Sequence, residues 1–454
     1  MGLKEHIFRA YDIRGIYGVD LDENVAETIG KAFGTFIGGS GKTVAVGYDV
    51  RLSSRSLKDS AVKGLLSVGV NVVDIGLVPT PIVYFTISHF VLDGGIVVSA
   101  SHNPPQWNGF KLCKEKGMIC GSGMGMEQIR DIALKGEFPV SPTGKVEDWR
   151  EKVLKEYETF LLGKVKIAKK INVLVDMGNG SCSQYADKIM EKAGLNVKTI
   201  SNVPDGRFPS RSPEPTEESL GELIDKMSTG KYDLGVAFDG DGDRTVFVDD
   251  RGRVIEGDRM LALYMKHFIK TPGEKVIYEV SCSKVIEDIA KEKKAKTIVT
   301  RVGHSFLLEK MIKEGALFGG ESSSHLYFKE VYGLDDAIFA SLKAAQLVSQ
   351  IRSKFSEMVD TLPKYIIRRK VYNVSDKIKF IVMDKLSTIF MNEGFKTTTI
   401  DGVRVDTEKG WFIIRASNTQ PQIKSSAEAI DQETLDLYEK MIESKLSKAT
   451  NEMK

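Results

Sequence analysis

Three aspartates stand almost side by side in the middle of the chain, at Asp239, Asp241 and Asp243, separated by single glycines and followed by Arg244. Unpaired carboxylates so close together repel one another by about 1 kcal/mol per pair in water and by several times that in a cleft. A cation would remove this repulsion, and oxygen ligands favour a hard ion such as Mg²⁺ or Ca²⁺. The glycines allow the backbone to curl so that the side chains face one point. The segment therefore predicts a metal-binding loop.

A solvated turn and a calcium-binding EF-hand are the two alternatives for this segment. Runs of Asp and Gly are common in exposed turns. The EF-hand fails on spacing: counted from Asp239, its sixth position should be Gly and is Arg244, and its twelfth should be Glu and is Asp250. Short apolar runs at 232–238 and 245–248 flank the loop, which predicts a strand on each side rather than a helix.

The bulk composition limits the class of protein. A chain of 454 residues is too long for one hydrophobic core and predicts three or four domains. Its net charge of +2 gives no signature of nucleic-acid binding, and no stretch approaches the roughly 18 apolar residues of a membrane span. The N-terminal residues carry charges where a signal peptide is apolar. The four cysteines show neither CxxC pairing nor zinc spacing, which predicts reduced, packed thiols in a cytoplasmic protein.

The chain repeats a strand–helix–strand pattern loosely three times, at 43–75, 171–200 and 275–300. In each repeat a helical segment separates two short, continuously apolar strands. A crossover helix between such strands predicts a parallel pairing in a sheet that is covered on both faces. The repeats therefore predict three related α/β domains with mixed, mostly parallel sheets.

Each repeat is followed by a further strand that runs into a polar loop. The strand 95–98 leads into Ser-Ala-Ser-His-Asn-Pro at 99–104, the strand 236–238 leads into the aspartate loop, and the strand 316–319 leads into Gly-Glu-Ser-Ser-Ser-His at 320–325. Ligands of open α/β sheets bind beyond the carboxyl ends of the strands. We therefore expect the three loops to converge on one cleft between domains.

The last part of the chain has a different pattern and predicts a smaller α+β domain. A helix is expected near 377–392, a hairpin at 402–405 and 411–414, and a charged amphipathic helix from about Gln432. The hairpin ends in Arg-Ala-Ser-Asn-Thr-Gln-Pro at 415–421, whose donors are suited to an oxyanion such as phosphate. The predicted domains are 1–146, 147–249, 250–363 and 364–454.

Taken together, the loops resemble those of the α-D-phosphohexomutases of the phosphomannomutase/phosphoglucomutase type, in the same order and over the whole chain. The family's phosphoserine loop, Thr-Ala-Ser-His-Asn-Pro, is present with Ser99 in first place, and its Asp-Gly-Asp-Gly-Asp-Arg loop is unaltered. The family's sugar loop is similar to 320–325, its phosphate loop to 415–421, and its opening motif to 8–15. The resemblance implies a heart-shaped molecule with a central cleft.

The resemblance also implies a reaction. Hexose 1-phosphate and hexose 6-phosphate would be interconverted through a phosphoserine at Ser101 and a hexose 1,6-bisphosphate, which acts as intermediate and activator. One Mg²⁺ per chain would be bound by the three aspartates and by an oxygen on Ser101, balancing the roughly −2 charge of a phosphoserine. Arg244, Lys111 and His102 would stabilise charge or transfer protons during in-line phosphoryl transfer.

A further set of residues is implied to bind the substrate, a small-molecule sugar phosphate. Glu321 and Ser323 would bind the sugar hydroxyls, and charge-assisted hydrogen bonds to a carboxylate are the stronger kind. The other implied contacts, several of them to the non-transferred phosphate, are Tyr11, Arg14, His304, His325, Arg415, Ser417, Asn418 and Thr419. The chain is expected to act as a monomer or a weak homo-oligomer, without nucleic acid or membrane.

One residue departs from the family pattern. Ser324 replaces the usual Gly of the sugar loop, and if the position needs φ > 0 the substitution costs about 1 kcal/mol. Asn418 and Gln420 are similar to the phosphomannomutase/phosphoglucomutase loop rather than to the Ser-Gly-Thr-Glu-Pro loop of phosphoglucosamine mutase, which favours mannose and glucose phosphates. The alternatives are a phosphoglucosamine mutase, a Mg²⁺-dependent sugar phosphatase, and a catalytically silent sugar-phosphate-binding protein.

Overall fold

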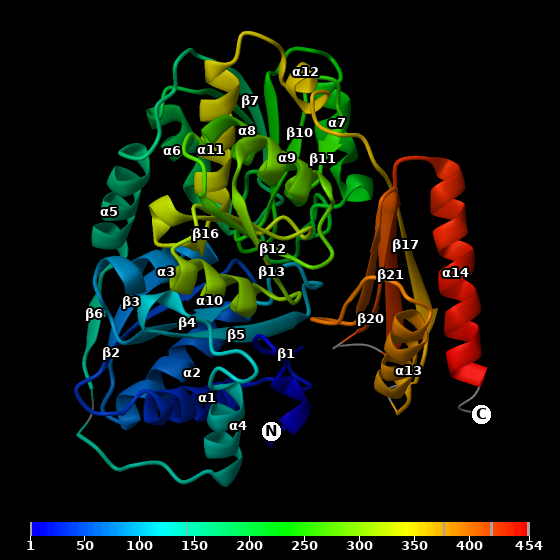
Figure 1. Cartoon of the computed structure of the whole chain (residues 1–454). Coiled ribbons are helices and arrows are strands. Elements are labelled where there is room, and N and C mark those ends of the chain that lie inside the picture. The colour runs from blue at the N-terminus through cyan, green and yellow to red at the C-terminus, as the bar shows by residue number, and fades with distance from the viewer. Residues whose placement is uncertain (1, 143, 376, 418–420, 452–454) are drawn as a thin grey trace.

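The computed structural model describes residues 2–142, 144–375, 377–417 and 421–451. Figure 1 shows three domains with α/β layers packed against one another and a fourth domain beside them. One hydrophobic core runs through the first three domains and includes Phe85, Tyr157 and Phe318, whereas the fourth domain has a core of its own around Phe412. The predicted fold class is confirmed: three domains have mixed α/β sheets, and the C-terminal domain has an antiparallel sheet.

The first domain has a six-stranded sheet in the order β1-β5-β4-β2-β3-β6. β2, β3, β4 and β6 pair in parallel, and β5 is antiparallel to both of its neighbours. The strands are β1 (Ile13–Ile16), β2 (Thr43–Tyr48), β3 (Asn71–Leu77), β4 (Gly94–Val98), β5 (Trp107–Lys114) and β6 (Val146–Asp148), and the helices are α1 (Glu23–Phe36), α2 (Ser54–Ser67), α3 (Thr80–His89) and α4 (Met126–Lys135). β4 is buried along its whole length, as expected for a central strand covered on both faces.

The second and third domains repeat the parallel core of the first. Their sheets have the orders β11-β10-β9-β7-β8 and β13-β12-β14-β15-β16. The second contains α5 (Arg150–Leu162), β7 (Asn172–Asp176), α6 (Ala186–Lys192), β8 (Asn196–Ile200), α7 (Gly221–Met227), β9 (Leu234–Phe238), β10 (Thr245–Val248) and β11 (Val254–Ile255). The third contains α8 (Gly257–Phe268), β12 (Lys275–Glu279), α9 (Val285–Lys293), β13 (Lys296–Thr300), α10 (His304–Glu314), β14 (Phe318–Gly320), β15 (Leu326–Phe328), β16 (Leu334–Asp335), α11 (Ala337–Gln350) and α12 (Phe355–Val359).

Each predicted repeat corresponds to the same pairing of strands in its sheet. The first strand of each repeat, β2, β7 or β12, pairs in parallel with the strand that precedes a functional loop, β4, β9 or β14. The next strand along the chain, β5, β10 or β15, returns antiparallel to the strand before the loop. Each functional loop therefore lies at the carboxyl end of the parallel strands of its sheet.

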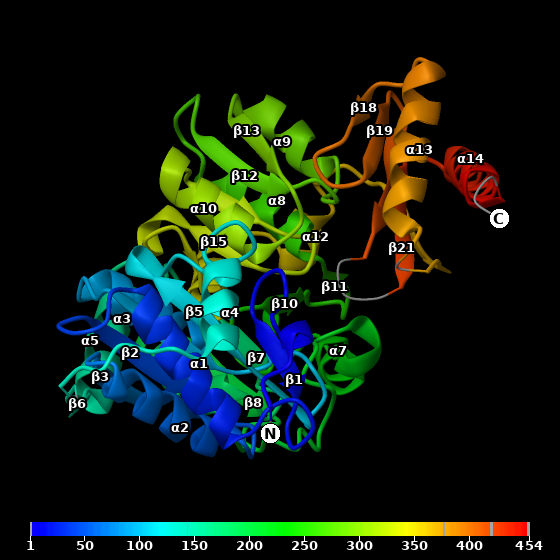
Figure 2. The same ribbon diagram turned by 90° about the horizontal axis from the view of Figure 1, so that it is seen from below.

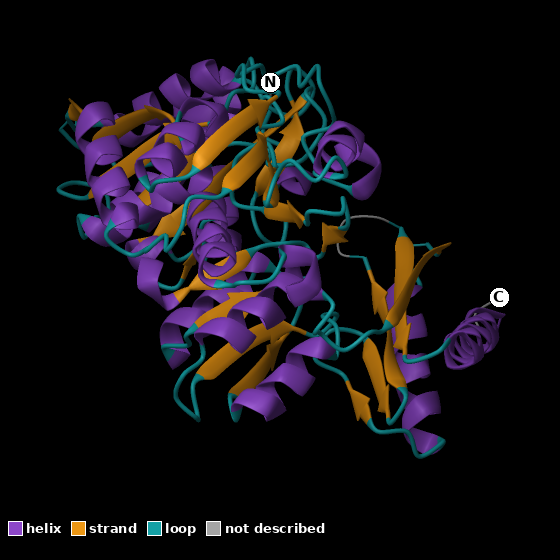
Figure 3. Ribbon diagram, turned by 90° about the horizontal axis from the view of Figure 1, so that it is seen from above, coloured by secondary structure: helices purple, strands orange, loops and turns teal. Residues whose placement is uncertain are grey.

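The fourth domain is an antiparallel sheet in the order β17-β21-β20-β19-β18, with two helices. Its elements are β17 (Ile366–Asn373), α13 (Lys379–Asn392), β18 (Thr397–Thr398), β19 (Val403–Thr407), β20 (Gly410–Ala416), β21 (Gln422–Ala429) and α14 (Gln432–Asn451). Figures 2 and 3 show α13 and α14 on the side of this sheet that faces away from the third domain. Buried Trp411 and Ile413 pack on Val280, which joins the sheet to the third domain.

Two hollows lie where the fourth domain approaches the others. One, of about 410 Å³, is lined by Tyr11 of the first domain, Val302 of the third and Asp401 of the fourth, among others. The other, of about 940 Å³, is lined by Arg244 of the second domain, Ser323 of the third and residues of the fourth. These hollows lie where a cleft between the domains was expected. In the described part of the chain, no helix has both the length and the apolar character needed to cross a membrane.

Candidate active site

The functional loops of the first three domains touch one another. The Thr80 N–H donates to the Asp241 carbonyl at 2.8 Å, which joins the first domain to the aspartate loop. A Cβ on Gly240 would lie only 2.6 Å from the Ser101 carbonyl oxygen, so glycine permits the close approach of these two loops. On the other side, the Thr245 N–H is 3.4 Å from the Ser324 carbonyl oxygen of the third domain.

Ser101 faces the aspartate loop from the first domain. Its backbone lies in the left-handed region at φ 48°, where its N–H donates to Ser99 Oγ at 2.8 Å. Its hydroxyl donates to Asp239 Oδ2 at 2.9 Å, and His102 Nδ1 lies 3.1 Å from the same Oγ. The charge of Arg244, together with burial, holds the pKa of His102 well below its usual range, so the His102 ring is neutral. A non-glycine residue held in this conformation is a common feature of functional sites.

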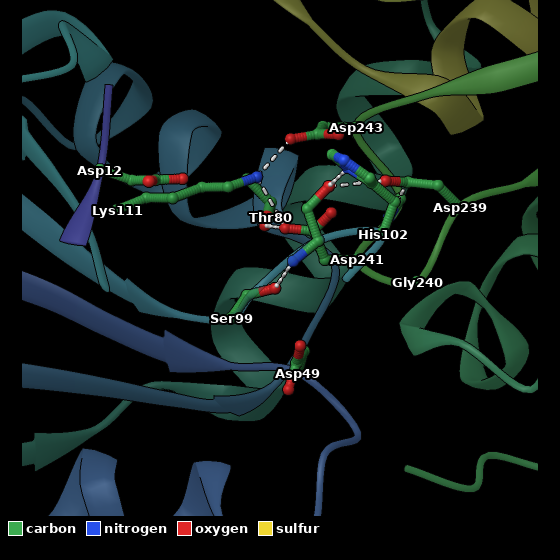
Figure 4. Close-up of polar contacts among 12 residues, drawn as sticks. Asp12, Asp49, Thr80, Ser99, His102, Lys111, Asp239, Gly240, Asp241 and Asp243 are labelled. Carbon is green, nitrogen blue, oxygen red and sulfur yellow. Dashed lines mark hydrogen bonds and ion pairs between the residues drawn. The ribbon is translucent and has the colours of Figure 1, made fainter. Parts of the chain in front are cut away.

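The three aspartates form a buried group with unsatisfied oxygen atoms (Figure 4). One oxygen of each lies within 4.8 Å of the others. Among the described residues, Asp241 Oδ1 and Asp243 Oδ1 have no hydrogen-bond partner. Burial raises the pKa of Asp239 well above its ordinary value, and the negative charges of Asp243 and Asp241 raise it further. Orphaned oxygens and mutual repulsion both fit a bound hard cation, as predicted from the sequence.

Lys111 binds the Oδ2 atoms of Asp241 and Asp243, whose Oδ1 atoms have no hydrogen-bond partner within the described chain. It lies on β5, is buried, and donates from Nζ to Asp241 Oδ2 at 2.7 Å and to Asp243 Oδ2. Thr80 Oγ1 donates to Asp241 Oδ2 as well. Burial alone would lower the pKa of Lys111, but the two carboxylates raise it above its usual value, so Lys111 is charged. Lys111 and Thr80 therefore orient Asp241 and Asp243 so that the Oδ1 atoms of both carboxylates point away from Lys111.

The sugar loop presents a buried carboxylate. Tyr327 donates its hydroxyl to Glu321 Oε1 at 2.8 Å, and Ser323 donates to Glu321 Oε2 at 3.2 Å. Ser324 has φ 72°. A positive φ strains a serine, as predicted from the sequence for this position, and that condition is met. Ser322, Ser323 and Ser324 line the 940 Å³ hollow together with Arg244.

The predicted residues Arg244, His304 and His325 are linked through Asp335. The Arg244 Nε–H donates to His325 Nε2 at 2.9 Å, and His325 Nδ1 lies 2.8 Å from Asp335 Oδ2. Because Nε2 accepts, Nδ1 carries the proton and donates it to Asp335. His304 Nε2 is 2.8 Å from the same Asp335 oxygen, and the two imidazole rings stack at 4.9 Å. Both ring nitrogens of His325 are thus engaged within the protein, which favours a role in holding Arg244 over direct contact with the sugar.

Tyr11 and Arg14 connect the N-terminal motif to two other parts of the site. The Tyr11 hydroxyl donates to the Val302 carbonyl at 2.9 Å. Arg14 donates from Nη1 to Asn103 Oδ1 at 2.8 Å, which places its guanidinium beside the serine loop.

The predicted phosphate loop is described only in part. Arg415 Nη2 donates to Asp401 Oδ2 at 2.9 Å, while the buried Arg415 Nε has no hydrogen-bond partner in the described part of the chain. The Ser417 carbonyl accepts from Lys379 Nζ at 2.6 Å. Asn418, Thr419 and Gln420 lie outside the described residues. A partly buried guanidinium with an unused donor is consistent with an oxyanion site.

Several residues that shape the site were not found from the sequence. They are Thr80, Asp335 and Arg51, the last of which contacts the serine loop through its guanidinium. Their sequence neighbours carry no recognisable motif. The signal that could have found Arg51 is its position two residues after the strand 43–49, at the carboxyl end where functional residues gather.

Comparisons with known proteins cover nearly the whole chain. Models described as "Phosphoglucomutase/phosphomannomutase" match as alpha/beta/alpha domain I at 5–139, domain II at 152–252, domain III at 256–365 and the C-terminal domain at 377–445. The chain is 36% identical over 434 residues to phosphomannomutase/phosphoglucomutase of Pseudomonas putida, covering 94% of the chain and 92% of that protein. It is 33% identical over 440 residues to phosphoglucomutase/phosphomannomutase of Thermococcus kodakarensis, covering 94% of the chain and 95% of the relative. The structure of a phosphoglucomutase/phosphomannomutase family protein from Burkholderia thailandensis superposes with a TM-score of 0.92 at 31% identity, covering 99% of this chain and 98% of that one.

Proposed function

The chain belongs to the phosphoglucomutase/phosphomannomutase family, and from this premise we propose that it moves a phosphoryl group between O1 and O6 of a hexose by way of Ser101. It is an isomerase of the phosphohexomutase type. The observation that carries the assignment to Ser101 is its 2.9 Å contact with Asp239 in a loop of the next domain. Mannose and glucose phosphates are the proposed substrates, and hexose 1,6-bisphosphate is the proposed intermediate and activator.

The proposed reaction begins with a phosphorylated Ser101. The bond from phosphorus to Ser101 Oγ breaks as a bond to the free sugar hydroxyl oxygen forms; the hydroxyl proton passes to the protein, and Oγ takes up a proton. The resulting bisphosphate turns end for end. Ser101 Oγ then attacks its other phosphorus and gives up its proton, while the sugar oxygen that leaves takes one up. His102 is the candidate proton carrier at Ser101, because its Nδ1 is 3.1 Å from Ser101 Oγ and a nearby phosphoserine would raise its pKa. It would give a proton to Oγ as the phosphoryl group leaves and take it back when Oγ attacks the second phosphoryl group.

Asp239, Asp241 and Asp243 are the proposed ligands of one Mg²⁺ per chain. Mg²⁺, when bound there together with a phosphoserine oxygen, would neutralise negative charge and polarise the phosphorus. Lys111 orients two of these ligands, and Arg244 is positioned by His325 to stabilise charge on the transferred phosphate. In-line phosphoryl transfer depends mainly on positioning and charge, which are what these groups supply.

The remaining residues are proposed to hold the substrate in either orientation. Glu321 and Ser323 would bind the sugar hydroxyls, with Tyr327 orienting the Glu321 carboxylate. Arg415, Ser417, Asn418 and Thr419 would bind the non-transferred phosphate, supported by the unused Arg415 Nε donor. Tyr11, Arg14 and His304 would border the substrate where the first and third domains meet.

We also infer a cytoplasmic protein that acts as a monomer or a weak homo-oligomer. All four cysteines are buried free thiols, which fits a reducing compartment. The proposed partners are small-molecule sugar phosphates. Gel filtration across a range of concentrations would test the oligomeric state.

The proposal is tested by intact-mass analysis together with rates on three substrates. Purified protein should contain a fraction heavier by one phosphoryl group, absent in Ser101→Ala. With glucose 1,6-bisphosphate and Mg²⁺ present, mannose 1-phosphate and glucose 1-phosphate should be isomerised faster than glucosamine 1-phosphate. A higher rate on glucosamine 1-phosphate would identify a phosphoglucosamine mutase instead. Sustained phosphate release without isomer formation would identify a phosphatase.

A further inference from the structure

We propose that one buried acidic residue, at the same place in each of the first three sheets, positions the functional loop of its domain. These residues are Asp49 directly after β2, Asp176 at the end of β7 and Glu279 at the end of β12. They are 1%, 3% and 1% exposed. Each strand pairs in parallel with the strand before the functional loop, so the acid and the loop share one edge of the sheet. The inference rests on the proposed roles of these loops.

In the first domain, Asp49 acts through Arg51. The Asp49 carboxylate accepts from the Arg51 backbone N–H at 2.9 Å and from Arg51 Nε at 3.0 Å. The guanidinium, held in this way, donates its four remaining N–H groups to three backbone carbonyls of the serine loop and to one at the start of β5. These acceptors are Ser101 at 2.8 Å, Asn103 at 2.6 Å, Pro104 at 2.7 Å and Trp107 at 3.0 Å. All five guanidinium donors are therefore used, and they fix the backbone from which Ser101 projects.

In the second domain, Asp176 acts through Arg211 in a similar way. Asp176 Oδ2 accepts from Arg211 Nε at 2.7 Å, and Arg211 Nη2 donates to the Phe238 carbonyl at 2.7 Å. Phe238 directly precedes the first metal-ligand candidate, Asp239. A Cβ on Gly178 would lie 2.6 Å from Arg211 Nη2, so a side chain there would displace the guanidinium. The pair thus sets where the aspartate loop begins.

In the third domain, Glu279 reaches the loop without an arginine. Its Oε1 accepts from the Ser322 hydroxyl at 2.8 Å and lies 3.3 Å from the Ser322 backbone nitrogen. Ser281 also donates its hydroxyl to Glu279, at 2.7 Å. Ser322 stands between Glu321 and Ser323, the proposed sugar-binding residues. The longer side chain of Glu makes the contact that the Asp–Arg pairs make in the other two domains.

A purely structural role would predict that loss of any of these contacts lowers stability in a similar way. A positioning role predicts instead that each loss alters the step served by its own loop. Three conservative changes in the full-length protein separate the two possibilities: Arg51→Lys, Arg211→Lys and Glu279→Gln. Lysine keeps the charge but cannot reproduce the planar fork of an arginine.

The measurements are kcat and KM for glucose 1-phosphate, the Mg²⁺ dissociation constant of dephosphorylated protein by calorimetry without sugar phosphate, and the melting temperature. Arg51→Lys should lower kcat by about tenfold or more, with KM changed by less than about twofold. Arg211→Lys should weaken Mg²⁺ binding by about tenfold or more. Glu279→Gln should raise KM by about three- to tenfold and leave Mg²⁺ binding unchanged. Asp49→Asn and Asp176→Asn are second variants that loosen the same arginines.

Matched controls exist on the surface. Arg207 bonds to Asp205 through its N–H at 2.9 Å and its Nε at 2.8 Å, as Arg51 does to Asp49, but its side chain is 72% exposed. Glu314 pairs at 2.9 Å with Lys275, at the start of β12. Arg207→Lys and Glu314→Gln should leave kcat, KM, the Mg²⁺ dissociation constant and the melting temperature unchanged. The inference is wrong if the three site variants change only the melting temperature, or all change the same parameter. If the wild-type protein shows no isomerase activity, the proposed function is wrong. The Mg²⁺ measurement on Arg211→Lys would still test whether Arg211 positions the aspartate loop.

Discussion

Ser101 Oγ lies 2.9 Å from Asp239 Oδ2, in a contact that joins residues 138 positions apart on two different sheets. The serine comes from the loop after β4 and the aspartate from the loop after β9. A phosphoryl group on Ser101 would therefore lie beside three carboxylates that already repel one another. A bound cation would offset this added negative charge, and the first two predictions test for it.

Asp241→Asn should weaken Mg²⁺ binding by at least about tenfold, because it removes one ligand charge from the cluster while keeping the shape of the side chain. Calorimetry on the dephosphorylated protein measures this directly. The activity should fall with it and recover in part at high Mg²⁺. Asp225→Asn, an exposed change on α7 in the same domain, serves as control. Unchanged Mg²⁺ affinity in Asp241→Asn would place the metal elsewhere.

Lys111→Met should lower the free energy of unfolding of metal-free protein by about 3–5 kcal/mol, because it leaves two buried carboxylates without their cation. Urea unfolding in the presence of a chelator measures the loss. Mg²⁺ should restore part of it by mass action on the folded state. Lys114→Met, at the end of the same strand, should change stability little. An equally small effect at Lys111 would contradict its assigned role.

Ser324→Gly should raise the free energy of unfolding by up to about 1 kcal/mol, because Ser324 has φ 72°, a conformation that glycine adopts without strain. Ser201 has φ 52° in the second domain, and Ser201→Gly is the matched comparison outside the site. Urea unfolding of both variants gives the measurement. A loss of stability in Ser324→Gly would mean that its side chain contributes more than its backbone conformation costs.

Asp336→Asn should flatten the pH dependence of stability. Burial raises the pKa of Asp336 to about 7 from an ordinary 3.8, so the folded protein holds a proton that the unfolded chain has released. This contribution to stability is present below about pH 4 and is lost as the pH rises through 7, with a slope of at most about 1.4 kcal/mol per pH unit. Asn keeps the helix cap that Asp336 provides at the Phe339 N–H.

Unfolding in urea at pH 5, 6, 7 and 8 would test this prediction. Asp258, whose pKa is also raised to about 7 by burial, should leave a residual slope of the same sign in the variant. Parallel stability curves for the wild type and Asp336→Asn would show that Asp336 does not hold the proton.

The residues proposed to carry the chemistry could be predicted from the sequence because they stand in short continuous motifs. The aspartate loop, the serine loop and the sugar loop each occupy six consecutive residues after an apolar strand. The strand–helix–strand repeats likewise predicted the parallel cores, since apolar periodicity and crossover length are local properties. Strain at Ser324 was expected, on the condition of a positive φ, because the family loop that it resembles has Gly there, and its φ of 72° meets that condition.

The tertiary structure alone decided how the loops are held and which groups face each other. Arg51 and Arg211 resemble ordinary charged residues until their guanidinium groups are seen on the carbonyls of other loops. His325 was expected at the sugar, but its two ring nitrogens are engaged by Arg244 and Asp335. Such contacts join residues far apart in the chain, and a side chain's partners there depend on how the sheets pack rather than on its neighbours in sequence.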